Sequence, residues 1–164
     1  MTYRIYCFVI LLLLSIKITA IYLTDFDLFG DESQYWLWSR KLELGYYSKP
    51  PMLAWLLNFH TFIFGNSFES IKFFPLIFYF ILSYVVYLLS YSLFHNKNLA
   101  IISAFSFYLI PSVSLSSFII STDIILLFFC SLSLLVLLRI REKPNFINFL
   151  VLGILLGLSF LSKY

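Results

Sequence analysis

Charged residues are scarce in this chain: they make up 12% of its 164 residues, whereas hydrophobic residues supply 62%. A soluble globular domain carries about twice that share of charge, so the composition excludes an ordinary soluble domain. The 11 basic and 8 acidic residues give a net charge of +3 without a basic block, which argues against nucleic-acid binding. With a mean hydropathy of +0.95, the sequence predicts an integral membrane protein.

Cysteine, glycine and proline are also few. The two cysteines, Cys7 and Cys130, lie in separate apolar runs without CxxC or Cys/His spacing. This arrangement predicts buried free thiols and argues against a disulfide framework or a zinc site. With only five glycines and five prolines, the chain shows no flexible linker, and it contains no internal repeat.

What the chain has in abundance is long apolar runs. A helix that crosses a bilayer needs roughly 17–25 predominantly apolar residues, and by this measure the sequence predicts an all-α membrane fold with about five transmembrane helices. The predicted spans cover about residues 6–23, 73–94, 99–120, 124–138 and 146–161.

The connections between these runs predict the topology. Basic residues near the span ends should lie on the cytoplasmic side, and five of them fall on one side of the predicted membrane: Arg4, Lys97, Arg139, Arg141 and Lys143. The long connection, residues 24–72, is then extracytoplasmic. Counting crossings places this loop, Asp123 and Lys163 on the same face, which suits a polar site at one mouth of a helix bundle.

The long loop contains two segments with helical patterns. The stretch "GDESQYWLWSRKLELG", residues 30–45, reads as an amphipathic helix at the membrane interface, with Asp31 as N-cap and Gly45 at the C-terminal cap. "YYSKPP" follows as a stiff turn, and residues 51–65 predict a second interfacial helix. On the residues alone, a capping role for Asp31 with aromatic anchoring stands beside a catalytic role.

The order of motifs in this loop resembles a known family. An acidic pair that opens an aromatic helix, then Gly-Tyr-Tyr, then Lys-Pro-Pro and "LAW", all after a first transmembrane helix, looks like the first extracytoplasmic loop of GT-C membrane glycosyltransferases. Within this class it resembles the protein O-mannosyltransferase-like and lipid A aminoarabinose transferase-like enzymes. "STDIILLFF" and "GLSFLSKY" resemble later segments of the same family.

This resemblance implies transfer of a sugar from a polyprenyl-phosphate donor to an acceptor lipid, glycan or protein. The reaction needs a carboxylate that takes the proton of the acceptor hydroxyl and a positive charge at the departing phosphate. Asp31 matches the acidic position and is the predicted base, and Glu32 would orient substrate or help to hold a cation. Lys49, with Tyr46 and Tyr47, is predicted to bind the donor phosphate and substrate. A lysine that snorkels to the interface is the alternative for Lys49.

A divalent metal ion is the one cofactor that the sequence suggests. Asp123 could supply a carboxylate to such an ion, or it could cap the helix that follows it. Some aminoarabinose-type relatives carry an acidic residue directly before the Lys-Pro turn, where this chain has Ser48. That difference weakens the case for a metal bound there and for the same sugar specificity.

The sequence is compatible with three functions. The first is the N-terminal part of a glycosyltransferase in the cell inner membrane, because family members are several-fold longer; a separately encoded C-terminal part could then be a partner besides the membrane lipids. The second is an inactive or accessory membrane protein of the same ancestry. The third is a small transporter subunit, which should place ionisable groups at mid-bilayer on several helices, whereas only Lys17 lies there.

Overall fold

The computed structural model describes residues 3–23 and 27–163, with side chains in the first helix from Phe8 onward. Arg4 and the Cys7 thiol, which the sequence interpretation used, therefore lie outside the described side chains, whereas Cys130 is a half-buried free thiol. All regular secondary structure in the described residues is α-helical. Eight helices occur there: α1 Tyr3–Leu23, α2 Gly30–Arg40, α3 Met52–Phe64, α4 Phe68–Phe94, α5 Lys97–Leu109, α6 Pro111–Ser116, α7 Thr122–Glu142 and α8 Phe146–Phe160.

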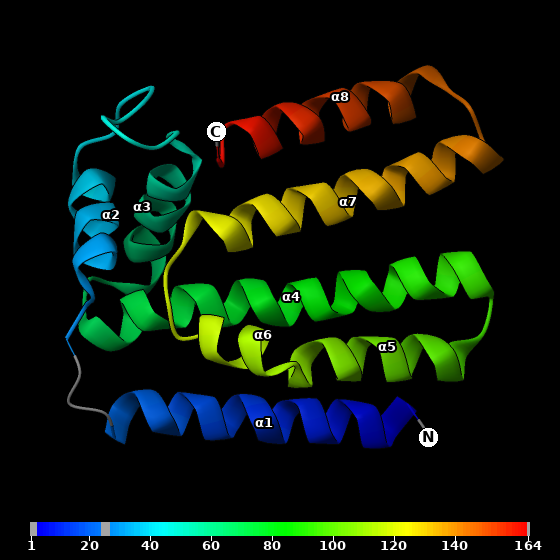
Figure 1. Ribbon diagram of the computed structural model, residues 1–164, viewed down its shortest axis with the longest axis horizontal. Coiled ribbons are helices and arrows are strands. Elements are labelled where there is room, and N and C mark those ends of the chain that lie inside the picture. The colour runs from blue at the N-terminus through cyan, green and yellow to red at the C-terminus, as the bar shows by residue number, and fades with distance from the viewer. Residues whose placement is uncertain (1–2, 24–26, 164) are drawn as a thin grey trace.

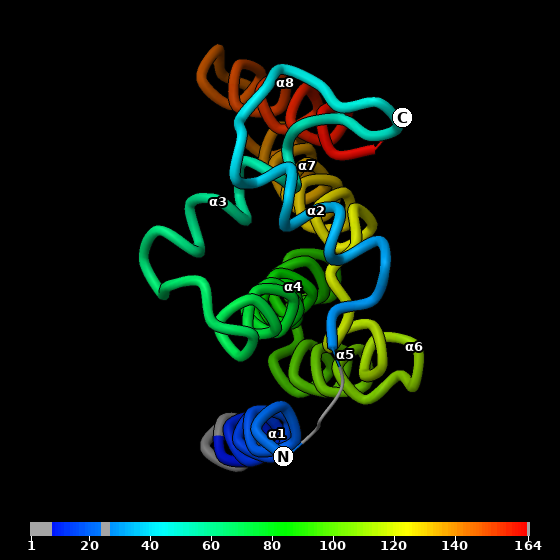
Figure 2. The backbone as a smooth tube through the Cα atoms, turned by 90° about the vertical axis from the view of Figure 1, so that its left-hand side faces the viewer, coloured from blue at the N-terminus to red at the C-terminus, as the bar shows by residue number. Residues whose placement is uncertain are grey.

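The long helices lie side by side, and α2 and α3 lie at one end of them (Figure 1). The central helix α4 packs against α5 and α7, while α8 packs on α7 and α1 reaches both α4 and α5. Viewed along their axes, these helices form an open row rather than a closed bundle (Figure 2). The main core lies where α2, α3, α4 and α7 meet, around Leu57, Phe74, Leu82 and Ile124.

Two helices in the described residues, α4 and α7, are long and apolar enough to cross a membrane. The apolar part of α1, together with α3 and α8, is apolar but shorter. These helices and the composition indicate a membrane protein. The predicted number of five spans stays a prediction.

The predicted span over residues 99–120 is not one helix. It is divided into α5 and α6 at Pro111, which occupies the first turn of α6, where its missing N–H costs no hydrogen bond. The backbone N–H of Ile110 still donates a hydrogen bond to the carbonyl of Ser106 at 3.1 Å. The short helix α6 and the turn after it then bring the chain to the start of α7.

Local capping explains several helix ends. Ser67 begins α4, because its side chain accepts a hydrogen bond from the Ser70 N–H at 3.2 Å. Asn96 and Asn145 cap α5 and α8 in the same way, and each such cap contributes about 1 kcal/mol. Gly65 ends α3 with φ 86° and ψ 179°, a conformation that is essentially open to glycine alone.

Candidate functional site

The end of the structure that carries α2 and α3 also carries the start of α7 and the end of α8 (Figure 1). Two contacts tie these segments together. The Lys163 ammonium forms an ion pair with the Asp123 carboxylate, and the Met52 N–H donates to the Leu161 carbonyl at 3.1 Å. Asp123 and Lys163 therefore lie at the same end of the helices as the polar residues of the long loop.

Asp31 is exposed in the first turn of α2. Its carboxylate makes no hydrogen bond or ion pair to the part of the chain that the structure describes. A negative charge is favourable here, because the free N–H groups of a helix start carry a partial positive charge. Asp31 is thus an exposed side chain without an internal partner among the described residues, and it is accessible to a substrate.

Asp31 is not the helix cap that the sequence predicts. The N-cap position belongs to Phe29, and its N–H is satisfied by Glu32, whose Oε2 accepts from it at 2.9 Å. The predicted C-terminal cap at Gly45 is wrong as well, because α2 ends at Arg40 with Lys41 as the C-cap. The N-cap error has a clear cause: the third residue of a helix can reach back to the cap N–H, and the sequence pattern does not show which acid does so.

Glu32 lies in a different environment from Asp31. Its side chain is fully buried, and its Oε2 accepts a hydrogen bond from the Lys72 ammonium at 2.6 Å. The other oxygen, Oε1, accepts from the N–H of Ile120 at 2.8 Å. Lys72, itself 6% exposed, also donates to the Phe118 carbonyl at 3.2 Å. Internal partners thus hold both oxygens of Glu32, and its predicted catalytic role remains untested.

The Tyr35 phenol is influenced by the charges of both Asp31 and Asp123. It lies one turn after Asp31 on α2, is 5% exposed, and packs beside Trp38 with ring centroids 5.8 Å apart. Burial raises the pKa of the Tyr35 phenol, and the negative charges of Asp31 and Asp123 raise it further. Both carboxylates are therefore within electrostatic reach of the same phenol, although one is on α2 and the other on α7.

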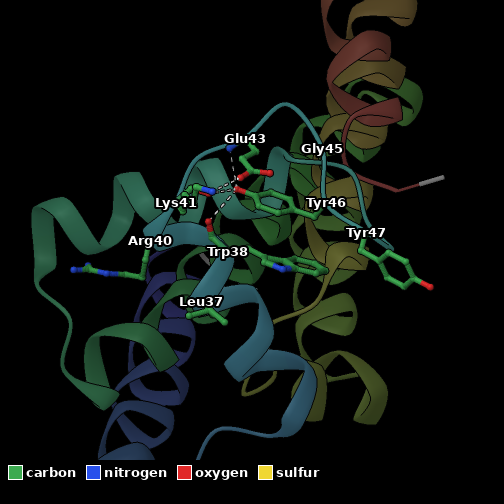
Figure 3. A pocket seen from close by; sticks show the side chains of 8 residues that line it. All are labelled: Leu37, Trp38, Arg40, Lys41, Glu43, Gly45, Tyr46 and Tyr47. Carbon is green, nitrogen blue, oxygen red and sulfur yellow. Dashed lines mark hydrogen bonds and ion pairs between the residues drawn. The ribbon is translucent and has the colours of Figure 1, made fainter.

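The loop after α2 is built around Tyr46 (Figure 3). The Tyr46 ring stacks on Trp38 at a centroid distance of 4.8 Å. Its hydroxyl lies 2.9 Å from the Trp38 carbonyl and 3.0 Å from the Lys41 carbonyl, and it accepts from the Glu43 N–H at 3.3 Å. Tyr46 therefore fixes the loop conformation, whatever it contributes to substrate binding.

Beside Tyr46 is an open cleft of about 410 Å³. Tyr47 is fully exposed at its edge and points away from the protein (Figure 3), so its ring is free to meet a ligand. The residues that line the cleft are Leu37, Trp38, Arg40, Lys41, Glu43, Gly45, Tyr46 and Tyr47.

Lys49 is half-buried in the turn that follows. Its carbonyl accepts from the Tyr46 N–H at 3.1 Å, which fixes its backbone, and Pro50 and Pro51 lead directly into α3. Within residues 3–23 and 27–163, no acidic side chain pairs with its ammonium. Lys49 is therefore a cation whose charge is not neutralised internally, although no contact joins it to Asp31.

Asp123 does not cap α7, which was one of the two roles that the sequence suggested for it. The N-cap of α7 is Ser121, and Asp123 lies inside the first turn, so the capping interpretation is wrong. Its carboxylate is paired with Lys163, and the described residues contain no group of three or more His, Cys, Asp or Glu side chains. The described residues alone therefore do not form a metal site; metal dependence stays a prediction, and we derive no step through a metal.

The sequence interpretation missed Lys72 altogether. The only sequence signal is a lysine at the beginning of an apolar run, and that is equally typical of an interfacial residue. Its partner lies 40 positions earlier, a separation that no helical periodicity connects. One sequence without relatives could not have revealed the pair.

Comparisons with known proteins show the family of the chain. The profile of the dolichyl-phosphate-mannose-protein mannosyltransferase family matches residues 48–164. A lipid A galacturonosyltransferase from Rhizobium johnstonii is 36% identical over 160 residues, which cover 94% of this chain and 33% of that protein. The undecaprenyl phosphate-alpha-4-amino-4-deoxy-L-arabinose arabinosyl transferase of Wigglesworthia glossinidia brevipalpis is 27% identical over 126 residues, covering 74% of this chain and 22% of that protein.

No solved structure matches the chain. The chain spans about a third or less of the length of these two curated relatives. The family match nevertheless covers most of the chain and includes Lys49, Asp123 and Lys163. The chain therefore belongs to the dolichyl-phosphate-mannose-protein mannosyltransferase family of GT-C membrane glycosyltransferases.

Proposed function

We propose that this chain forms the N-terminal part of an enzyme that moves a sugar from a polyprenyl-phosphate donor to a lipid acceptor at the outer face of the cell inner membrane. The family name and the name of the arabinosyl transferase both specify a polyprenyl-phosphate-linked sugar. The name of the galacturonosyltransferase specifies a lipid acceptor. The later helices of the site would come from the remainder of the family's length, on the same polypeptide or on another.

The observation that carries this proposal is the Asp31 carboxylate, which is exposed, unpaired within the described residues and at the same end as Asp123. In the proposed reaction the acceptor hydroxyl oxygen forms a bond to the anomeric carbon, and its proton passes to Asp31. The bond between the anomeric carbon and the phosphate oxygen breaks, and the polyprenyl phosphate leaves with that electron pair. A nearby cation stabilises the charge that develops on the phosphate.

Lys49 is the proposed phosphate-binding cation. Its ammonium has no acidic partner in the described residues, and its backbone is fixed by Tyr46. By contrast, Lys163 is paired with Asp123 and Lys72 with Glu32. The exposed ring of Tyr47 would lie against the sugar or the lipid, since aromatic faces suit both.

Substitution Lys49→Met tests this role. A hydrogen bond to a charged group contributes about 1.5–3 kcal/mol, so we expect the KM for the polyprenyl-phosphate sugar to rise roughly 10- to 100-fold. The measurement is transfer of labelled sugar in membranes that carry the full-length enzyme. Lys97→Met, an exposed lysine at the start of α5, is the matched control and should behave like the wild type. An unchanged donor KM in Lys49→Met would leave Lys49 as an interfacial lysine.

The proposed topology places α2 and α3 on the extracytoplasmic side of the membrane. Asn66 and Asn98 are exposed at opposite ends of α4 and its connections. Single cysteines at these positions in a cysteine-free background should react with an impermeant thiol reagent differently in intact cells: Asn66→Cys should be labelled and Asn98→Cys should not. Labelling of Asn98→Cys alone would invert the topology.

A further inference from the structure

The buried ion pair of Glu32 and Lys72 joins three segments that are far apart in the sequence. Glu32 comes from α2, Lys72 from α4, and both bind the backbone of the turn between α6 and α7. Glu32 Oε1 accepts from the Ile120 N–H at 2.8 Å, and the Lys72 ammonium donates to the Phe118 carbonyl at 3.2 Å. The pair thus has a hydrogen-bond partner on each side of Ile119.

Two of the three segments that this pair joins, α2 and the turn before α7, present the carboxylates of the site. Asp31 is the residue directly before Glu32 on α2. Asp123 follows Ile120 by three positions, in the first turn of α7. A displacement of Glu32 would therefore move Asp31, and a displacement of the turn would move Asp123.

Charge and burial make this connection stiff. The carboxylate of Glu32 accepts hydrogen bonds from Lys72, Phe29 and Ile120, and it is 0% exposed. Charge-assisted hydrogen bonds are short and directional, and in a low-dielectric interior no water can replace them. Rotation of α2 about its axis would break several of them at once.

We propose that Lys72 is a positioning residue for sugar transfer, which acts through Glu32 to hold Asp31 and Asp123 in a fixed relation. This inference rests on the proposed function, in which Asp31 takes the proton of the acceptor. Proton transfer and displacement require atoms to be placed within a fraction of an ångström. Lys72 itself touches neither donor nor acceptor in this proposal.

The test uses the double substitution Glu32→Gln with Lys72→Met, because Lys72→Met alone leaves a buried carboxylate unpaired and can prevent folding. The double variant keeps the side-chain volumes and removes both charges. Gln has one acceptor oxygen, so it cannot accept all the hydrogen bonds that Glu32 accepts. We expect the protein to fold, kcat to fall roughly 10- to 100-fold, and the KM for the donor to stay within about twofold, since no donor contact is removed.

A second readout is independent of transfer. Spin labels at Gln34 on α2 and Leu127 on α7, both exposed, report the distance between the two segments by pulsed EPR spectroscopy. The wild type should give a narrow distance distribution and the double variant a broad or shifted one. The single variant Lys72→Arg retains Glu32, the positive charge and the donor capacity. It should therefore retain both the narrow distribution and the wild-type kcat.

Lys17→Met is the matched control. Lys17 is also a buried lysine beside the same segment, and its ammonium donates to the Ser117 hydroxyl at 2.8 Å, but it has no acidic partner in the described residues. Its removal should leave the distance between Gln34 and Leu127 unchanged. An equal broadening in Lys17→Met would show that any buried lysine has this effect and would overturn the specific role of Lys72.

Failure of the inference can be distinguished from failure of the proposed function. A folded double variant with wild-type kcat and a narrow distance distribution would overturn the positioning role, while loss of transfer in Asp31→Asn would still support the proposed function. Conversely, normal transfer by Asp31→Asn would overturn both the base and the purpose assigned to Lys72. The EPR distances would then show only whether the pair orders α2 against α7.

Discussion

Substitution Asp31→Asn should remove most of the transferase activity of the full-length enzyme while leaving its membrane insertion and abundance unchanged. Asn keeps the shape of Asp but cannot take a proton from the acceptor hydroxyl. Loss of one positioned acid–base group lowers a rate by about 10²–10⁴-fold. The measurement is kcat for transfer of labelled sugar from the polyprenyl-phosphate donor, in membranes with matched amounts of protein.

Helix stability cannot account for a loss of this size. The Asp31 side chain is not the cap of α2, because Glu32 binds the cap N–H. Substitution removes only the interaction of one charge with the helix start, which contributes about 0.3–1 kcal/mol. Asp27→Asn is the matched control, since Asp27 is an exposed acid of the same loop that lies before the helix. Near-normal transfer by Asp31→Asn would end the catalytic assignment and leave the aromatic helix as a membrane anchor.

The long helices could be predicted from the sequence because apolar runs of this length have few other solutions. Their boundaries could not. Helix α4 begins at Phe68 rather than near Phe73, because Ser67 supplies a cap before the apolar run starts. Helix α7 continues to Glu142, past the last apolar residue of its run. In both cases hydrogen bonds at the helix end determine where the helix begins or ends, and hydropathy does not measure these bonds.

The two acids of the loop, Asp31 and Glu32, show which property of the site the sequence could not predict. Asp31 and Glu32 are neighbours, so they point about 100° apart around the helix axis. Which of them faces the core depends on how α2 packs against α3 and on the contacts of Glu32 with Lys72 and with the turn at Ile120. The sequence could therefore place an acidic pair in the long loop at one end of the helices. It could not show that one acid is exposed and the other is buried in an ion pair.

Replacement of Lys72 by Met should have the largest effect on stability of the substitutions considered. It leaves the fully buried Glu32 carboxylate without its cation, and breaking a buried ion pair by removing one partner costs about 3–5 kcal/mol. That is a large fraction of a typical total stability of about 5–15 kcal/mol. The measurement is the free energy of unfolding in detergent micelles, followed by loss of helical circular dichroism as denaturant is added.

The double variant separates charge from packing in this prediction. Glu32→Gln with Lys72→Met removes both charges at nearly constant volume, and neutral replacement of a buried ion pair is often tolerated. We expect it to unfold at a denaturant concentration close to that of the wild type, well above that of Lys72→Met. The coupling between the two positions is then the difference between the effect of the double substitution and the sum of the single ones. A double variant as unstable as Lys72→Met would mean that the hydrogen bonds to Phe118 and Ile120, rather than the uncompensated charge, stabilise this end of the protein.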